Sequence, residues 1–244
     1  MADRSVFISG SSRGIGAETA KRFAKAGYSA VITYQNSEAE ARAVAAECQK
    51  LGAPQTLILE LDAANDENIA RAARLTREKF GTIDVLVNNA GIFQYAPLTG
   101  QSLAEIQNQI SVNLAGPIKL TRELLPSVKS AVINVGSGLG LVGKGQAVPY
   151  SAGKWGIRGF TKSLAKERPA LRVYAVHPGL TATSMGNAGG MPPSLVAEII
   201  FNAAEGNYHF KNGSDIDVKY YVLGPAGRLI YALKFVIKKI LGRI

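Results

Sequence analysis

Residues 6–16 have the sequence VFISGSSRGIG, an apolar run that leads into a glycine-rich turn, and a helical pattern continues to residue 26. Strand, tight turn and helix are the parts of a phosphate-binding βα unit. The glycines let the backbone approach a ligand, and the helix N-terminus offers free N–H groups to a pyrophosphate. Their spacing is Gly-x-x-x-Gly-x-Gly rather than the more familiar Gly-x-Gly-x-x-Gly, and spacing alone also occurs in unrelated turns. The stretch predicts that the chain opens with a nucleotide-binding unit.

The rest of the chain alternates strand and helix patterns. Strands are predicted at 29–34, 56–62, 83–87, 131–136 and 171–176, and helices at 38–51, 66–80, 102–125, 150–167 and 194–204. This alternation predicts an α/β fold with a doubly wound, Rossmann-like parallel sheet in three αβα layers. Ligands of such sheets bind beyond the carboxyl ends of the strands. The residues expected at those ends are Gly10, Asp62, Asn88, Ser137 and Pro178.

We expect a single domain. The 244 residues are 47% hydrophobic, enough for one sizeable core, and no linker or low-complexity segment divides them. The catalytic domain is expected at 1–217, and residues 218–244 are expected to add a last strand, at 217–223, and a C-terminal helix. Cys48 is the only cysteine and the chain has two histidines, so neither an internal disulfide nor a metal site is expected. The N-terminus shows no apolar signal core, which favours the cytoplasm.

The positive charge is concentrated at the C-terminus. The net charge is +10, and residues 218–244 contain six Lys or Arg and no acid, so the rest of the chain carries only about +4. Residues 228–244 form a basic amphipathic pattern. Such a helix could pack on its own domain or on a partner subunit, or it could lie on an anionic membrane surface. Nucleic acid is not an expected partner, because the pattern lacks a stacking platform.

Tyr150 and Lys154 are the first candidates for chemistry. They stand four residues apart, so on a helix they share one face. An ammonium beside a phenol favours the phenolate and is expected to lower the tyrosine pKa toward working pH. Such a hydroxyl can give or take a proton at a substrate oxygen. Ser137 follows the apolar strand at 131–136, whose carboxyl end would present its hydroxyl to the same place.

Three further stretches are candidates for cofactor contacts. The end of the second strand, at 34–37, reads YQNS and lacks the acid that usually binds a ribose 2′-hydroxyl. Arg13 could face a 2′-phosphate there, which favours NADP(H) over NAD(H); alternatively it is a solvated loop charge. Asp62 could bind an adenine amino group or cap the following helix. Residues 88–91, NNAG, could brace strand ends or line the cleft, and we expect some of both.

With these motifs in order, residues 5–185 resemble the short-chain dehydrogenase/reductase family. The resemblance is carried by the glycine turn, by NAG after the fourth strand, by Ser137, by the Tyr-x-x-x-Lys pair and by Pro178-Gly179. It implies a catalytic tetrad of Asn113, Ser137, Tyr150 and Lys154. The implied cofactor contacts are Gly10, Ser12, Arg13, Gly14, Ile15, Gly16, Asn36, Ser37, Asp62, Ala63, Asn88, Asn89, Ala90, Gly91, Tyr150, Lys154, Pro178, Gly179, Thr181 and Thr183.

The resemblance also implies a mechanism, hydride transfer between a nicotinamide and a carbonyl carbon. Ser137 would bind the substrate oxygen and Tyr150 would protonate it. Lys154 would lower the tyrosine pKa and hold the nicotinamide ribose, and Asn113 would support a water that relays protons to Lys154. NADPH is the implied cofactor, and a homo-oligomer, dimer or tetramer, is the implied assembly. The family's usual Asp-Gly-Gly-like C-terminal turn is not found in this chain, which weakens a specific assignment to fatty-acid synthesis.

The expected function is therefore an NADP(H)-dependent reductase of a ketone or aldehyde, or the reverse dehydrogenase. The substrate is expected to be apolar, because the predicted pocket walls are Phe93, Gln94, Leu139, Leu180 and Met185. One alternative is a membrane-surface reductase of a lipid-like or acyl-thioester carbonyl. A more distant alternative is a non-catalytic cofactor sensor or scaffold, which loss of the serine or tyrosine would have favoured.

Overall fold

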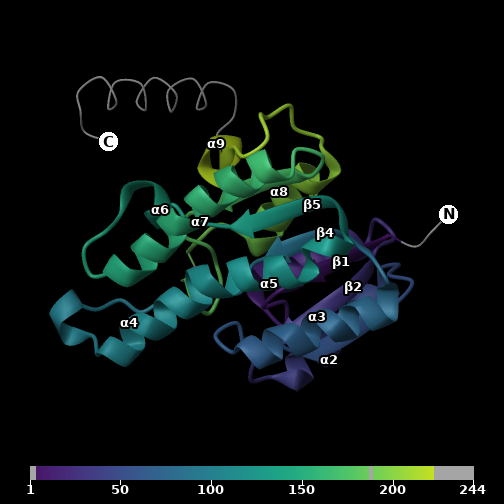
Figure 1. Cartoon of the computed structure of the whole chain (residues 1–244), viewed down its shortest axis with the longest axis horizontal. Helices are drawn as coiled ribbons and strands as arrows, with labels where there is room; N and C mark the ends of the chain where they lie inside the picture. Colours follow the sequence, from purple (N-terminus) through teal and green to yellow (C-terminus); the bar gives the residue numbers. More distant parts are fainter. Residues whose placement is uncertain (1–3, 187–188, 223–244) are drawn as a thin grey trace.

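The computed structural model describes residues 4–186 and 189–222, and in these residues it contains one parallel seven-stranded sheet in the order β3-β2-β1-β4-β5-β6-β7 (Figure 1). The strands are β1 (Ser5–Ile8), β2 (Ser29–Tyr34), β3 (Thr56–Glu60), β4 (Ile83–Asn88), β5 (Val128–Val135), β6 (Arg172–His177) and β7 (Asp215–Asp217). The order reverses between β1 and β4, which is the point where doubly wound sheets bind their ligands. The predicted single-domain doubly wound fold is confirmed.

Helices cover both faces of the sheet (Figure 1). One layer consists of α1 (Gly14–Ala24), α2 (Glu38–Lys50) and α8 (Pro193–Glu205), and the other of α3 (Asp66–Phe80), α5 (Gly116–Leu124) and α7 (Val148–Glu167). The strand side chains alternate between the two layers, so Val6 and Ile8 pack with Phe23 of α1 while Phe7 packs with the other layer. Both faces of the central strands are therefore buried, which explains their continuous apolar runs.

The predicted helix at 102–125 is not continuous. After α4 (Leu103–Ile110), residues Ser111–Ala115 form a π-helical segment before α5 begins. The N–H of Gly116 donates to the carbonyl of Ser111, five residues back. The cause lies in the next residue, because Pro117 has no N–H to offer the carbonyl of Asn113 four residues earlier. The wide turn therefore contains Asn113.

The predicted last strand at 217–223 is wrong. Strand β7 is short and ends at Asp217, and the chain continues as helix α9 (Val218–Val222). The Asp217 carboxylate accepts a hydrogen bond of 3.0 Å from the N–H of Lys219, as residues at helix starts do. Val218 is fully buried in the core between the sheet and the layer of α1, α2 and α8. Local capping and packing thus override the strand preference of the tyrosines and valine that follow.

Two shorter helices lie outside the main layers, α6 (Leu139–Val142) and the 3-10 turn Leu98–Gly100, and a second 3-10 turn, Leu125–Ser127, leads into β5. Helix α6 lies in the glycine-rich segment that follows Ser137. The basic amphipathic helix predicted for residues 228–244 lies outside the described residues. In the part of the chain that is described, no helix has the length and apolar character needed to cross a membrane.

Candidate active site

The glycine turn between β1 and α1 is packed so tightly against Gly16 that a side chain would not fit at this position. A Cβ atom on Gly16 would lie 2.3 Å from the carbonyl oxygen of Gly10 and 2.6 Å from Nδ2 of Asn89. Helix α1 starts behind this turn, and Arg13 at its N-cap makes no capping hydrogen bond with its side chain in the described chain. The first turn of α1 is also free of acidic residues. A close-packed turn and an uncapped helix N-terminus fit a pyrophosphate.

The tandem asparagines after β4 brace the sheet. Nδ2 of Asn89 donates to the carbonyls of Ser9 and Gly10, both at 2.9 Å, and so ties β4 to the glycine turn. Asn88 is buried and donates to Thr121 and to Asn134 on β5, both at 2.8 Å. The bracing interpretation of this motif is therefore borne out by the contacts. Ala90 and Gly91 follow at the same edge and lie beside Gly10 and Asn113, respectively.

The residues expected near a 2′-phosphate lie near the carboxyl end of β2. Arg13 is exposed, and its Nη1 lies 3.8 Å from a carboxylate oxygen of Glu40 on α2. Asn36 is exposed, and Ser37 is the N-cap of α2 but makes no capping hydrogen bond with its side chain, a finding that holds for the described residues. The Ser37 hydroxyl and the Arg13 guanidinium both lie near the carboxyl end of β2.

Asp62 does not cap α3. Its Oδ1 accepts from the N–H of Ala64 at 2.9 Å, which closes a turn just after β3. The cap of α3 is Asn65, whose side chain accepts from the N–H of Asn68 at 2.9 Å. The capping interpretation of Asp62 is therefore wrong, and its carboxylate, with Ala63 beside it, remains at the carboxyl edge of the sheet.

Asn113, Lys154 and Gly91 meet at the centre of that edge. A Cβ on Gly91 would lie 2.9 Å from Oδ1 of Asn113 and 3.4 Å from Nζ of Lys154. Asn113 is completely buried, accepts from the N–H of Ile92 at 3.2 Å and donates to the Ile92 carbonyl at 2.8 Å. Nζ of Lys154 donates to the Val135 carbonyl at 2.9 Å, at the end of β5. Three segments far apart in the sequence are thereby held together.

Tyr150 and Lys154 share one face of α7, as predicted, and Nζ of Lys154 lies 5.9 Å from the centre of the tyrosine ring. The expected lowering of the Tyr150 pKa is wrong for the protein alone. Burial raises the pKa of Tyr150 above its ordinary value, and a hydrogen bond with the Ser137 side chain opposes this only in part. Burial also lowers the pKa of Lys154 to about 8. The site thus presents a neutral phenol next to a lysine that loses its proton readily.

The depressed lysine pKa predicts how stability depends on pH. Lys154 binds its proton more weakly in the folded chain, at a pKa of about 8, than at its ordinary 10.5. The unfolded chain then binds more protons, so the free energy of unfolding should rise from pH 8 toward pH 10. Urea unfolding of the wild type and of Lys154→Met across this range measures the effect, which the variant should lose. Equal slopes in the two proteins would contradict it.

Ser137 completes the cluster at the end of β5. Its Oγ accepts from the N–H of Leu139 at 3.2 Å, which leaves the hydroxyl proton available to a second acceptor. Its own N–H donates to Nδ1 of His177 at 3.2 Å. His177 was not among the predicted site residues, although it follows a predicted strand and directly precedes Pro178-Gly179.

The loop after β6 reaches the glycine turn. The carbonyl of Pro178 accepts from the N–H of Gly138 at 2.8 Å. The Thr181 hydroxyl donates to the Gly179 carbonyl at 3.0 Å. A methyl carbon of Thr183 lies 3.2 Å from the place of a Cβ on Gly14. The loop after β6 therefore lies beside the glycine turn through Thr183 and beside the segment after Ser137 through Pro178.

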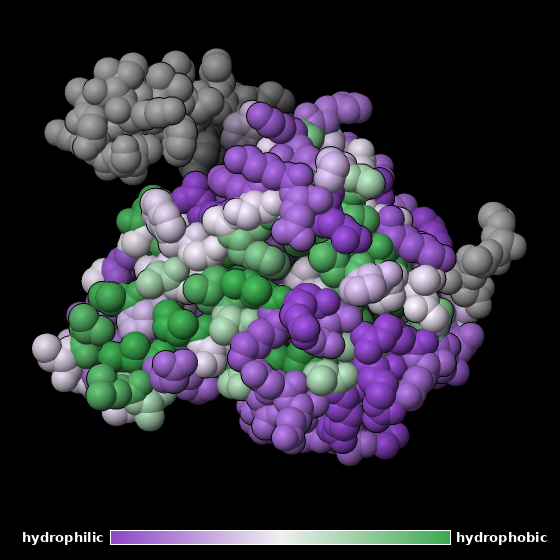
Figure 2. Space-filling view, viewed as in Figure 1, coloured by the Kyte–Doolittle hydropathy of each residue, from purple (hydrophilic) through white to green (hydrophobic). Residues whose placement is uncertain are grey.

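An aromatic side chain packs against Tyr150, and further apolar side chains are exposed in nearby segments. The Phe93 ring packs edge-on against Tyr150 with the ring centres 4.7 Å apart. Large exposed apolar residues in the segments around the cluster include Tyr95, Leu98, Val142, Leu180 and Met185. Figure 2 shows hydrophobic side chains gathered over α4 and the neighbouring segments on this face of the molecule.

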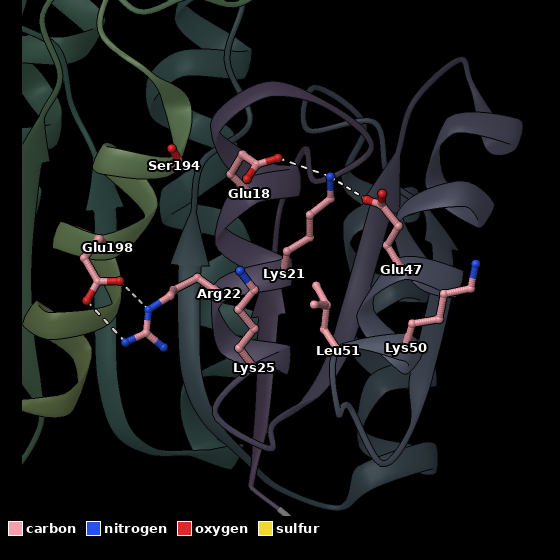
Figure 3. A pocket seen from close by; sticks show the side chains of 9 residues that line it. All are labelled: Glu18, Lys21, Arg22, Lys25, Glu47, Lys50, Leu51, Ser194 and Glu198. Atoms are coloured by element: carbon pink, nitrogen blue, oxygen red, sulfur yellow. Dashed lines mark hydrogen bonds and ion pairs between the residues drawn. The ribbon is translucent and has the colours of Figure 1, made fainter.

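A separate hollow lies between α1, α2 and the start of α8 (Figure 3). Its charged side chains largely pair with one another: Lys21 lies between Glu18 and Glu47, and Arg22 pairs with Glu198. None of the predicted catalytic residues lines it. We therefore place the candidate site at the carboxyl edge of the sheet and not in this hollow.

Fold and site together define a Rossmann-like nucleotide-binding protein. Residues 4–190 match the short chain dehydrogenase family, and the chain belongs to this family of oxidoreductases. It is 37% identical over 184 residues to a 3-oxoacyl-acyl-carrier-protein reductase of Synechocystis, covering 73% of this chain and 74% of the relative. It is 35% identical over 195 residues to a trans-4-hydroxycyclohexanecarboxylate dehydrogenase of Sinomonas cyclohexanicum, covering 76% and 75%. A short chain dehydrogenase of Burkholderia cenocepacia in complex with NADP superposes with a TM-score of 0.82 at 30% identity, covering 89% and 96%.

Proposed function

We propose that the protein is an NADP(H)-dependent oxidoreductase that reduces a ketone or aldehyde to an alcohol, or runs the reverse reaction. The observation that carries the proposal is the meeting of Asn113, Ser137, Tyr150 and Lys154 at one edge of the sheet. The relatives support this type of reaction, since one is named a reductase and another a dehydrogenase. When bound, the dinucleotide would supply the hydride.

In this proposal the serine and the tyrosine act on the substrate oxygen. The Leu139 N–H occupies the Ser137 oxygen, so the serine proton can be donated to a carbonyl oxygen. Tyr150, whose pKa is raised, is protonated at neutral pH and can give its proton as negative charge develops on that oxygen. Lys154 is the cation nearest to the tyrosine ring and would stabilise the phenolate after the proton has left.

Asn113 would supply the last part of the proton route. Pro117 cannot donate to the Asn113 carbonyl, so this oxygen, inside the π segment, lacks the donor that a regular helix would give it. We assign it a water that relays protons to Lys154. The proposed contacts with the dinucleotide remain the glycine turn, Arg13, the segments at 36–37, 62–63 and 88–91, and the loop from Pro178 to Thr183.

The proposed substrate is apolar near its carbonyl. Phe93 packs on Tyr150, and Leu180 and Met185 are exposed on the loop after β6. Apolar walls disfavour a highly charged small substrate, because they cannot compensate the cost of removing it from water. The name of the Synechocystis relative favours an acyl-thioester carbonyl as the second candidate. Assembly into a homo-oligomer and contact of residues 228–244 with a membrane stay predictions.

Arg13 gives the cofactor preference a direct test. Arg13→Ala should weaken NADPH binding about tenfold, because a charged hydrogen bond to a phosphate is lost, and should leave NADH binding unchanged. Glu40→Gln is the matched control: it removes the carboxylate that lies 3.8 Å from Arg13 and should tighten NADPH binding. Fluorescence titration with both dinucleotides measures these constants. Equal losses for NADPH and NADH would argue that Arg13 does not face a 2′-phosphate.

The function itself is tested by NADPH consumption against a panel of carbonyl compounds. The panel should contain 3-oxoacyl thioesters, cyclic ketones and long-chain keto-lipids, each with and without the enzyme. We expect oxidation of NADPH with at least one apolar ketone and little with small charged oxoacids. Binding of NADPH without turnover of any carbonyl or alcohol would favour the cofactor-sensing alternative.

A further inference from the structure

A histidine outside the predicted tetrad holds the backbone of Ser137. His177 is the last residue of β6 and has no exposed surface. On one side of its ring, Nδ1 lies 3.2 Å from both the N–H and the carbonyl oxygen of Ser137. On the other side, Nε2 lies 2.9 Å from Oδ1 of Asp215 on β7. The ring thus connects the candidate serine to the last strand of the sheet.

The carboxylate sets which ring nitrogen carries the proton. An ionised Asp215 can only accept, so Nε2 donates to it. In a neutral imidazole Nδ1 is then the acceptor for the Ser137 N–H and not a donor to the Ser137 carbonyl. Arg158 and Lys162 hold Asp215 in its ionised form, at 3.1 Å and 2.7 Å. Burial would raise the pKa of Asp215, but the hydrogen bonds from His177, Arg158 and Lys162 outweigh it and lower that pKa below its ordinary range.

The packing around the ring is equally specific. A Cβ on Gly136 would lie 2.3 Å from Nδ1 of His177, so the ring lies directly against the backbone before Ser137. The flanking N–H groups of Gly136 and Gly138 donate to the carbonyls of Val176 and Pro178 at 2.7 Å and 2.8 Å. The His177 bond is the middle one of three in succession. It therefore fixes the orientation of the one peptide whose side chain would bind the substrate.

We propose that His177, oriented by Asp215, is a positioning residue that sets the place of the Ser137 hydroxyl. This inference rests on the proposed function, because the serine hydroxyl matters only if it binds a reacting carbonyl. A displacement of the serine hydroxyl by about an ångström would leave the protein folded, but the hydroxyl would donate poorly to that oxygen.

Two matched variants separate the two sides of the ring. In His177→Asn the side-chain oxygen can take the place of Nδ1 and keep the Ser137 bond, while the contact with Asp215 is lost. In His177→Gln the side-chain nitrogen can take the place of Nε2 and keep the Asp215 bond, while the acceptor for Ser137 is lost. We expect His177→Gln to lower kcat on the order of tenfold to a hundredfold with KM little changed, and His177→Asn to stay within about threefold of the wild type.

A double-mutant cycle excludes a general structural effect. In a Ser137→Ala background His177→Gln should cause no further loss of kcat, because it acts through the missing hydroxyl. Additive losses, or an equal loss in His177→Asn and His177→Gln, would overturn the proposal. Should His177→Gln fail to fold, Asp215→Ala takes its place. Without the carboxylate either ring nitrogen of His177 can carry the proton, so kcat should fall, as expected for His177→Gln.

A measurement without substrate keeps this test apart from that of the proposed function. The ¹³Cζ resonance of labelled Tyr150, assigned by its absence in Tyr150→Phe, reports the tyrosine titration. The Ser137 hydrogen bond lowers the pKa of Tyr150. His177→Gln should therefore shift the titration to higher pH, as Ser137→Ala does, and His177→Asn should not. An unchanged titration in His177→Gln refutes the positioning role, whether or not the wild type reduces any carbonyl.

Discussion

Replacement of Tyr150 by phenylalanine should lower turnover by about a thousandfold while the dissociation constant for NADPH stays within about twofold. Positioned proton donors of this kind contribute roughly 10²–10⁴-fold. The large effect is expected because the described site offers the Ser137 hydroxyl as a hydrogen-bond donor but gives it no means of losing its proton. The variant keeps the aromatic ring, so the edge contact with Phe93 is preserved and the fold should be intact. Steady-state NADPH oxidation and cofactor fluorescence titration measure the two quantities.

Tyr95→Phe is the matched control for this variant. Tyr95 is a neighbouring tyrosine that is 51% exposed and whose ring lies near Phe93. Removal of the Tyr95 hydroxyl should leave turnover within about twofold. If Tyr150→Phe kept more than a tenth of the wild-type turnover, or if both variants lost activity alike, Tyr150 would not be the proton donor and the proposed mechanism would fail.

The pattern of the sequence was sufficient for the first six strands of the sheet, because the physics involved is local. Each central strand is apolar on both faces and each helix carries one apolar stripe, so the alternation of elements was readable directly. The site residues at the sheet edge followed from the same pattern, since Gly10, Asn88 and Ser137 stand where strands end. The pair Tyr150 and Lys154 followed from helical spacing alone.

The features that were missed depend on local backbone hydrogen bonding, on contacts between distant segments, or on depth of burial. Asn113 was predicted inside a regular helix, although Pro117 four residues later already removes the N–H that a regular turn needs. His177 and Asp215 are 38 residues apart, and only the pairing of β6 with β7 brings them together. The direction of the Tyr150 pKa was wrong because helical spacing shows the neighbouring charge but not the depth of burial. Burial raises the pKa of Tyr150 and outweighs the hydrogen bond with Ser137, which lowers it.

Replacement of Gly16 by alanine should have the second large effect, on stability and cofactor binding together. A Cβ there would lie 2.3 Å from the Gly10 carbonyl oxygen and 2.8 Å from the Ser11 Cα, both backbone atoms that cannot rotate away. The turn or the start of α1 must shift, at a cost of about 1–3 kcal/mol in the free energy of unfolding. Because the shifted atoms form the pyrophosphate cradle, NADPH binding should weaken at least about tenfold.

Gly159→Ala, within α7, separates this close approach from the general effect of replacing a helical glycine. A Cβ on Gly159 would meet nothing within 4 Å among the described atoms, so alanine should stabilise the protein by about 0.5–1 kcal/mol. Urea unfolding and fluorescence titration of the two variants give both comparisons. If Gly16→Ala were as stable as Gly159→Ala and bound NADPH with unchanged affinity, the turn would accommodate a Cβ atom without a shift of its backbone. The close packing between the glycine turn and Asn89 could then not be what shapes the cofactor site.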